Sequence, residues 1–217
     1  MVLVAVHTDT VREHAEFERC LAAVSADRRE RVMAAAQPDE RCRRLCAGLA
    51  LDACLHTVGL HEAEEPLKHG ANGKPRLAAH PAIEFNLSHS GEWAVCALDC
   101  SPVGVDIQQI RNANTQTLAA RYFTASESVW MESLPAEEQK TAFFRLWAAK
   151  ESVLKARGDG LQGLRSVPII GGDVLCPPSP WQLREYPMDG YILTVCSTQP
   201  FAETVSVISS ADSVLLR

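Results

Sequence analysis

The chain has 217 residues, of which 47% are hydrophobic and 22% charged, and its formal net charge is −6. This composition is that of one folded domain or two small ones, and it excludes long disordered tracts. The acidic balance argues against a nucleic-acid coat or a membrane-surface binder. Any anionic ligand must therefore be held by a local group of basic side chains.

The start of the chain, MVLVAVHTDTVREH, shows no basic segment ahead of an apolar run and no small-residue cleavage site. We therefore expect no signal peptide, and no apolar run approaches the roughly 20 residues that cross a bilayer. Eight cysteines occur without a CxxC pair. In a cytoplasmic protein we expect buried reduced thiols rather than zinc ligands or disulfides.

The first half of the chain predicts one buried strand, then helices, then three short strands. The strand is expected at 2–6, and the helices at 11–24, 26–35 and 38–58. The stretch 59–81 is expected to be a loop containing Gly73-Lys74-Pro75. The three later strands are expected at 83–87, 93–98 and 103–107.

The second half repeats this order of elements. Helices are expected at 115–121, 126–133 and 137–157, and strands near 165–170, 181–185, 191–196 and 203–208. Helices followed by antiparallel strands, twice over, predict an α+β chain of two similar halves, 1–105 and 106–217. We expect a pseudo-twofold arrangement in which each half packs a small antiparallel sheet on a long helix, although no sequence repeat is visible.

Asp106 and Gln108 stand two positions apart at the end of the strand predicted at 103–107. Residues i and i+2 of a strand face the same side, so an acid and an amide project together. Their oxygens are ligands suited to Mg²⁺. The alternative is an ordinary strand end whose polar residues face water.

Trp147, Glu151 and Lys155 recur at every fourth position of the helix predicted at 137–157 and share one face, with Lys150 beside them. A Glu151–Lys155 pair is ordinarily a surface ion pair worth roughly 0.2–0.5 kcal/mol. Apolar residues occupy most other positions around this stripe, however. We therefore expect the helix to be largely buried and its charges to need a partner or a ligand.

The segment 85–91, FNLSHSG, is interpreted as a tight turn between two strands. In such a turn Ser88, His89 and backbone N–H groups can donate to a phosphate, although a solvated histidine is the plainer alternative. Four basic residues lie in the first third of the chain: Arg28, Arg31, Arg43 and Lys74. Each one alone is interpreted as a surface charge, but their concentration in this part of an acidic chain suggests an anion site.

Four motifs occur together in a fixed order: Gly73-Lys74-Pro75, Asn86-Leu87-Ser88-His89-Ser90-Gly91, Gly104-Val105-Asp106-Ile107 and Trp147-x-x-Lys150-Glu151-x-x-x-Lys155. This set resembles the 4′-phosphopantetheinyl transferases of the longer single-chain type, which serve peptide, polyketide and siderophore synthases. The resemblance runs from about residue 20 to 165. It implies that coenzyme A lies between two α+β halves and that its phosphopantetheine arm passes to a serine of an apo acyl or peptidyl carrier protein. Adenosine 3′,5′-bisphosphate is then released.

The resemblance also implies residue roles. Asp106 and Glu151 would bind Mg²⁺, with Glu151 as the candidate base for the serine proton. Lys155 would neutralise the pyrophosphate, and Lys150 would help to orient it. His89 and Arg43 would hold the 3′-phosphate of coenzyme A. The remainder of the coenzyme A site would consist of Arg28, Arg31, Lys74, Pro75 and Ser88.

Gln108 departs from the family's pattern, in which this motif often ends Gly-x-Asp-Ile-Glu. An amide offers an oxygen without a charge, so we expect Gln108 to bind Mg²⁺ weakly or through a water. Because Asp106, Glu151 and Lys155 remain, we predict an active enzyme. Two alternatives stay open: a degenerate member that binds without turnover, and an unrelated Mg²⁺-dependent phosphoester enzyme.

A carrier-docking surface is predicted in the segment 115–131, near Glu127, where the family often has an acid close to the substrate cleft. Its apolar residues either form that surface or pack in the core: Leu118, Tyr122, Phe123, Val129, Trp130 and Met131. We expect a cytoplasmic monomer whose partners are coenzyme A and carrier proteins, with no nucleic acid and no membrane.

Overall fold

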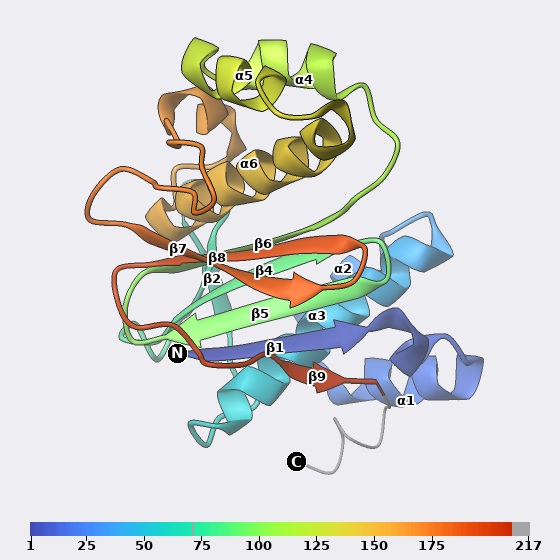
Figure 1. Cartoon of the computed structure of the whole chain (residues 1–217). Coiled ribbons are helices and arrows are strands. Elements are labelled where there is room, and N and C mark those ends of the chain that lie inside the picture. The colour runs from blue at the N-terminus through green and yellow to red at the C-terminus, as the bar shows by residue number, and fades with distance from the viewer. Residues whose placement is uncertain (71, 210–217) are drawn as a thin grey trace.

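The computed structural model describes residues 1–70 and 72–209 (Figure 1). Helices and small antiparallel sheets alternate as predicted, and the α+β class is confirmed. The pseudo-twofold relation and the division at residue 105 stay predictions. None of the helices in the described residues is long and apolar enough to span a bilayer.

The first half builds a sheet on one long helix, α3 (Pro38–His56). The strand order is β4 (Glu84–Ser90), β5 (Trp93–Asp99), β1 (Val2–His7) and β9 (Ser206–Ile208). The first three strands are antiparallel, whereas β9 runs parallel to β1. The shorter helices α1 (His14–Ala23) and α2 (Ala26–Met33) and a 3₁₀ turn (Thr8–Val11) complete this half.

The second half builds an antiparallel sheet in the order β6 (Val103–Gln109), β8 (Tyr191–Ser197) and β7 (Gln182–Met188). The helix α6 (Ala136–Arg157) packs on it. The helices α4 (Thr115–Tyr122) and α5 (Ala125–Glu132) lie over α6, on the side away from the sheet (Figure 1).

The two sheets pack against each other, so the molecule is layered as helix, sheet, sheet, helix (Figure 1). One face of β1 and β5, including Leu3 and Val95, meets Val105 and Leu193 from the second sheet. The other face of the first sheet packs on α3, and the other face of the second sheet packs on α6. Successive side chains of β1 and β6 point to opposite faces of their sheets. One set therefore packs between the two sheets, and the other set packs on a helix.

Several local expectations were wrong. The strand predicted at 165–170 is a 3₁₀ helix (Leu161–Ser166) followed by an extended segment in which Ile170 forms only a bridge with Cys176. The segment 59–81 contains a short hairpin, β2 (Leu67–His69) with β3 (Pro75–Leu77). The last predicted strand, β9, joins the sheet of the first half.

The thiol prediction is partly confirmed. All eight cysteines are free in the structure, and most of them are buried or half-buried. Cys100 and Cys176 are exposed, because both lie in connections outside the strands and helices. Burial raises the pKa of the Cys46 thiol far above its usual range, which keeps it protonated.

Gly104 sets the distance between β6 and α6. A Cβ atom at this position would lie 2.0 Å from the carbonyl oxygen of Ser152 and 2.4 Å from the backbone nitrogen of Ala156. Both are backbone atoms of the packed helix, so neither can move without shifting α6. Only glycine permits this approach.

We predict that Gly104→Ala lowers the free energy of unfolding by about 3 kcal/mol or more, because α6 must lift off the sheet. Urea denaturation measures the loss. Gly70→Ala is the matched control, since the nearest atom to a Cβ there is 3.7 Å away. Equal stability of the two variants would contradict this account of the packing.

Candidate active site

A cavity of about 320 Å³ opens where the two halves meet. Its walls come from α2, α3, β4, β6 and α6 and are formed by Arg28, Arg44, Ala47, Leu87, Ser88, His89, Asp106, Gln108, Glu151 and Lys155. The charged residues include two acids and four groups that are or can be cationic. The acids lie on β6 and α6, whereas the arginines lie on α2 and α3.

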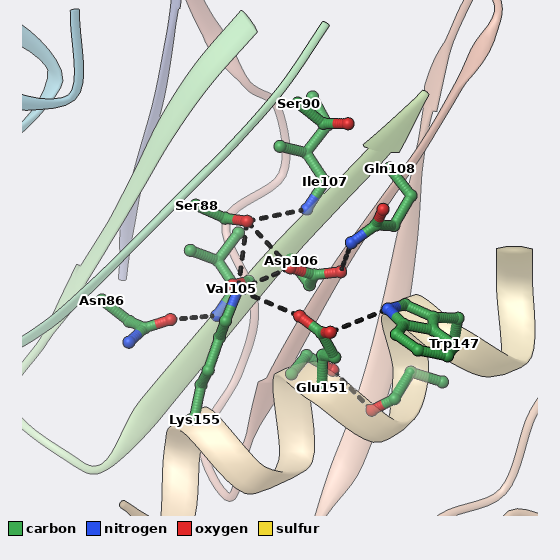
Figure 2. Close-up of polar contacts among 12 residues, drawn as sticks. Asn86, Ser88, Ser90, Val105, Asp106, Ile107, Gln108, Trp147, Glu151 and Lys155 are labelled. Atoms are coloured by element: carbon green, nitrogen blue, oxygen red, sulfur yellow. Dashed lines mark hydrogen bonds and ion pairs between the residues drawn. The ribbon is translucent and has the colours of Figure 1, made fainter. Parts of the chain in front are cut away.

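Asp106 is the centre of the acidic end and is only 1% exposed (Figure 2). Its Oδ1 accepts a hydrogen bond from Ser88 Oγ at 2.8 Å and lies 2.5 Å from Lys155 Nζ. Its Oδ2 accepts from Gln108 Nε2 at 2.8 Å. These donors hold both carboxylate oxygens of Asp106 in place.

Glu151 faces the same ammonium group from α6. Its Oε2 lies 3.7 Å from Lys155 Nζ, and its Oε1 accepts from Trp147 Nε1 at 2.7 Å. Burial, together with the negative charge of Asp106, raises the pKa of Glu151 from 4.5 to about 7, while Lys155 opposes the shift. Glu151 can therefore hold or release a proton near neutral pH.

The acidic end fits a hard divalent cation. Two carboxylates from different elements converge on one positive group, the Lys155 ammonium, and the Gln108 amide lies next to them. All of these donors supply oxygen, which is the ligand type that Mg²⁺ prefers. Among the described residues no group of three or more His, Cys, Asp or Glu side chains forms a metal cluster, so the set has two acids.

The basic end is formed by Arg28, Arg44 and His89. Arg28 Nε donates to the buried carboxylate of Glu62 at 3.2 Å. Its side chain lies over Gly48 of α3, where a Cβ atom would come within 3.1 Å of it. Burial, with the positive charges of Arg43 and Lys155 nearby, lowers the pKa of His89, and Glu40 opposes the shift.

Ser88 and His89 lie in β4 and not in a turn, which corrects the sequence interpretation. The turn consists of Gly91 and Glu92 alone, because β4 and β5 remain paired as far as Ser90 and Trp93. As neighbours on a strand, Ser88 and His89 would face opposite sides in an ideal sheet. Both nonetheless line the cavity, which sits at the edge of β4.

Two of the predicted arginines do not reach this cavity. Arg43 lines a neighbouring cavity of about 350 Å³, and its Nη1 donates to the carbonyl of Gly91 at 3.3 Å. Arg31 pairs with Asp27 and contacts His69 at the surface. Arg44, the residue after Arg43, lines the cavity instead, and the role that the resemblance implies for Arg43 stays a prediction.

Lys74 and Pro75 belong to a different part of the interface. Lys74 Nζ pairs with Glu84 at 3.3 Å and donates to the carbonyls of Val103 at 3.3 Å and Ala156 at 3.4 Å. Burial lowers its pKa. Lys74 lines a smaller cavity of about 180 Å³ that also includes Lys155, whereas Pro75 lies in β3 and borders none of these cavities.

The structure does not bring Lys150 to the cavity. Its ammonium is wholly buried and contacts Glu127 at 2.7 and 2.8 Å and the carbonyl of Val167 at 2.6 Å. Glu127 also accepts from the backbone N–H of Ile169 at 2.7 Å. The backbone carbonyl of Val167 and the backbone N–H of Ile169 therefore pair with side chains. This pairing replaces the hydrogen bonds to a neighbouring strand that were predicted at 165–170.

Sequence reasoning missed Arg44, Glu40 and Glu62. The arginines at 43 and 44 follow Glu40 by three and four positions on a helix, which is the spacing at which both can pair with one acid. That signal was readable. Glu62 lies in a loop between α3 and β2, and no spacing connects it with Arg28.

Comparisons with known proteins identify the family of the chain. The sequence model of the 4′-phosphopantetheinyl transferase superfamily matches residues 102–196. A 4′-phosphopantetheinyl transferase of Bacillus subtilis is 31% identical over 215 residues, covering 92% of this chain and 93% of the relative. The transferase Sfp of Bacillus subtilis (strain 168) is 26% identical over 224 residues, covering 96% and 98%. The transferase AcpT of Salmonella typhimurium is 35% identical over 159 residues, covering 71% and 80%.

The chain has an α+β fold with a charged cavity where its two halves meet. The chain belongs to the 4′-phosphopantetheinyl transferase superfamily. The family predicted from the four motifs is therefore confirmed, and so is the prediction of an enzyme.

The buried Lys150–Glu127 pair gives a prediction that separates a structural role from a ligand-binding one. We predict that Lys150→Met lowers the free energy of unfolding by about 3–5 kcal/mol, because Glu127 is left buried without its partner. The double variant Lys150→Met, Glu127→Leu should recover part of this loss. Urea denaturation measures both, and a Lys150→Met protein of unchanged stability would contradict the structural role.

Proposed function

We propose that this chain transfers the 4′-phosphopantetheine arm of coenzyme A to a serine of an apo acyl or peptidyl carrier protein. The reaction would be Mg²⁺-dependent and would release adenosine 3′,5′-bisphosphate. One observation carries the proposal: Asp106 and Glu151 converge on Lys155 at one end of a cavity whose other end is lined by Arg28, Arg44 and His89. A ligand with two separate phosphate groups matches these two ends.

Lys155 is suited to the charge that builds up during transfer. The serine oxygen forms a bond to the β-phosphorus of coenzyme A, and the bond from that phosphorus to the bridging oxygen breaks. Negative charge then accumulates on the leaving bisphosphate. Lys155 lies between the two carboxylates and can turn its ammonium toward that oxygen while it stays within the cavity.

Glu151 is the candidate base. Its carboxylate takes the serine proton directly or through a water, and a pKa raised to about 7 matches that task better than an ordinary glutamate does. Trp147 holds one carboxylate oxygen through its indole N–H at 2.7 Å, which fixes the direction of the other. Ser88 would orient Asp106 in the same way.

Asp106, Glu151 and the oxygen of Gln108 would hold Mg²⁺. When bound, the ion neutralises charge on the diphosphate. Gln108 already contacts Asp106 through its amide nitrogen, so a rotation of the amide group about its last side-chain bond would present its oxygen to a cation.

The partners follow from the same proposal. They are coenzyme A and a carrier protein, and the net charge of −6 gives no support for nucleic acid or membrane. In the predicted docking segment, Phe123 and Met131 belong to the core, whereas Val129 is 66% exposed and available to a partner. A cavity built wholly from one chain allows a monomer, and the cytoplasm supplies both substrates.

The direct test incubates the chain with coenzyme A, Mg²⁺ and an apo carrier protein and measures the carrier by mass spectrometry. We expect the mass of one phosphopantetheine arm to be added. Glu151→Ala should slow transfer by about 10²–10⁴-fold while coenzyme A still binds. Glu137→Ala, an exposed change on the same helix, is the control.

Unmodified carrier in the presence of tight coenzyme A binding would indicate a degenerate member. Hydrolysis of unrelated phosphoesters without transfer would indicate a different enzyme. Full activity of Glu151→Ala would remove Glu151 from the mechanism.

Gln108→Glu tests the metal end. The new carboxylate would lie next to Asp106, so we predict that half-maximal transfer needs roughly tenfold less Mg²⁺, equivalent to about 1.4 kcal/mol. Gln109→Glu adds the same charge one position on, beside the neighbouring cavity, and should leave the Mg²⁺ titration unchanged. An unchanged titration for Gln108→Glu would show that residue 108 does not face the metal.

A further inference from the structure

Glu40 lies next to three basic side chains, Arg43, Arg44 and His89, although it does not itself line the cavity. Its Oε2 accepts from Arg43 Nε at 3.0 Å, and its Oε1 accepts from Arg44 Nε at 2.9 Å. The same Oε1 lies 3.9 Å from His89 Nε2 on β4. One carboxylate therefore bonds two consecutive arginines of a helix and lies within ion-pair distance of a histidine of a strand.

The two arginines are held side-on, by their Nε atoms. The Nη1 of Arg43 donates to the carbonyl of Gly91, and the Nη1 of Arg44 donates to the carbonyl of Arg31 at 2.8 Å. Each guanidinium plane is thus fixed by two acceptors. Arg44 is thereby held in the wall of the cavity with donors to spare.

Arg28 is fixed in the same way, by a second acid. Its Nε donates to Glu62, which is 1% exposed and also accepts from the backbone N–H and the hydroxyl of Ser25. In both cases an acid behind the wall of the cavity fixes an arginine that forms the wall. Arginines preset in this way lose little freedom when they bind an anion.

The ionisation of Glu40 agrees with this role. Burial alone would raise the pKa of Glu40, but hydrogen bonds from Arg44 and Arg43 outweigh it and lower the pKa. Glu40 is therefore charged when it holds the arginines. A charged carboxylate near an anion site also repels the anion. Glu40 therefore favours anion binding only if its orientation of the arginine gains more binding free energy than this repulsion costs.

We propose that Glu40 is a positioning residue that presets Arg44, beside His89, to bind a phosphate monoester dianion. The inference rests on the proposed function, in which coenzyme A supplies one such group, its 3′-phosphate. Glu40 touches no substrate atom in this account. It acts through Arg44 and sets the affinity for that phosphate alone.

The test measures binding of coenzyme A and of 3′-dephospho-coenzyme A by titration calorimetry, for the wild-type chain and for Glu40→Gln. We expect Glu40→Gln to weaken coenzyme A binding about tenfold and to change 3′-dephospho-coenzyme A binding less than about twofold. In transfer assays KM for coenzyme A should rise by the same factor at nearly constant kcat.

Glu16→Gln is the matched control. Glu16 also accepts from the Nε of an arginine three positions on, Arg19, at 3.0 Å, but it lies on α1 and lines no part of this cavity. It should change neither affinity. Glu40→Asp keeps the charge but cannot span both arginines, so we expect it to behave like Glu40→Gln.

Equal weakening of both ligands, no weakening, or tighter coenzyme A binding in Glu40→Gln would overturn the inference. Full affinity in Glu40→Asp would overturn it as well, because charge alone would then suffice. These outcomes do not depend on turnover. A wild-type chain that binds coenzyme A in preference to the dephospho form but modifies no carrier would refute the proposed function and leave the role of Glu40 standing.

Discussion

The outer edge of β6 is the constraint on which the rest of the structure depends. On one side β6 pairs with β8, and on the other it faces β4 of the first half, with which it shares no ladder. Side chains at alternate positions of β4 replace that ladder. The backbone N–H groups of Val105 and Ile107 donate to Asn86 and Ser88 (Figure 2). The backbone N–H of Gln109 donates to Ser90 in the same way. Buried backbone groups are thus satisfied without closing the gap between the sheets.

Two lysines complete this edge. Lys74 donates to the carbonyl of Val103 and Lys155 to that of Val105. Ser88 and Lys155 therefore serve the edge and the cavity together, because each also contacts Asp106. The bonds that set the distance between the halves also orient the acidic end, so the cavity is positioned by the packing of the whole molecule.

Much of the fold was readable from the sequence. The long helices at 38–58 and 137–157 were predicted within a few residues because apolar spacing and terminal signals agree there. The strand prediction at 165–170 failed because the backbone carbonyl of Val167 and the backbone N–H of Ile169 pair with the side chains of Lys150 and Glu127, and local sequence does not encode those contacts. Lys150 was misplaced for the same reason: helical spacing puts it beside Glu151, and only the position of α5 shows which way it is satisfied.

The chain by itself determined which chemical groups are present and in what order: the acid and amide at 106 and 108, the stripe at 147, 151 and 155, and the glycine that lets α6 approach β6. Period-2 and period-4 spacing is a property of a single element, and it can be read without a partner. The tertiary structure alone decided which basic residue completes the cavity, that Arg44 lines it while Arg43 does not, and that Glu40 and Glu62 stand behind its wall. Those contacts join elements distant in the chain, and their geometry depends on how two sheets and two helices pack.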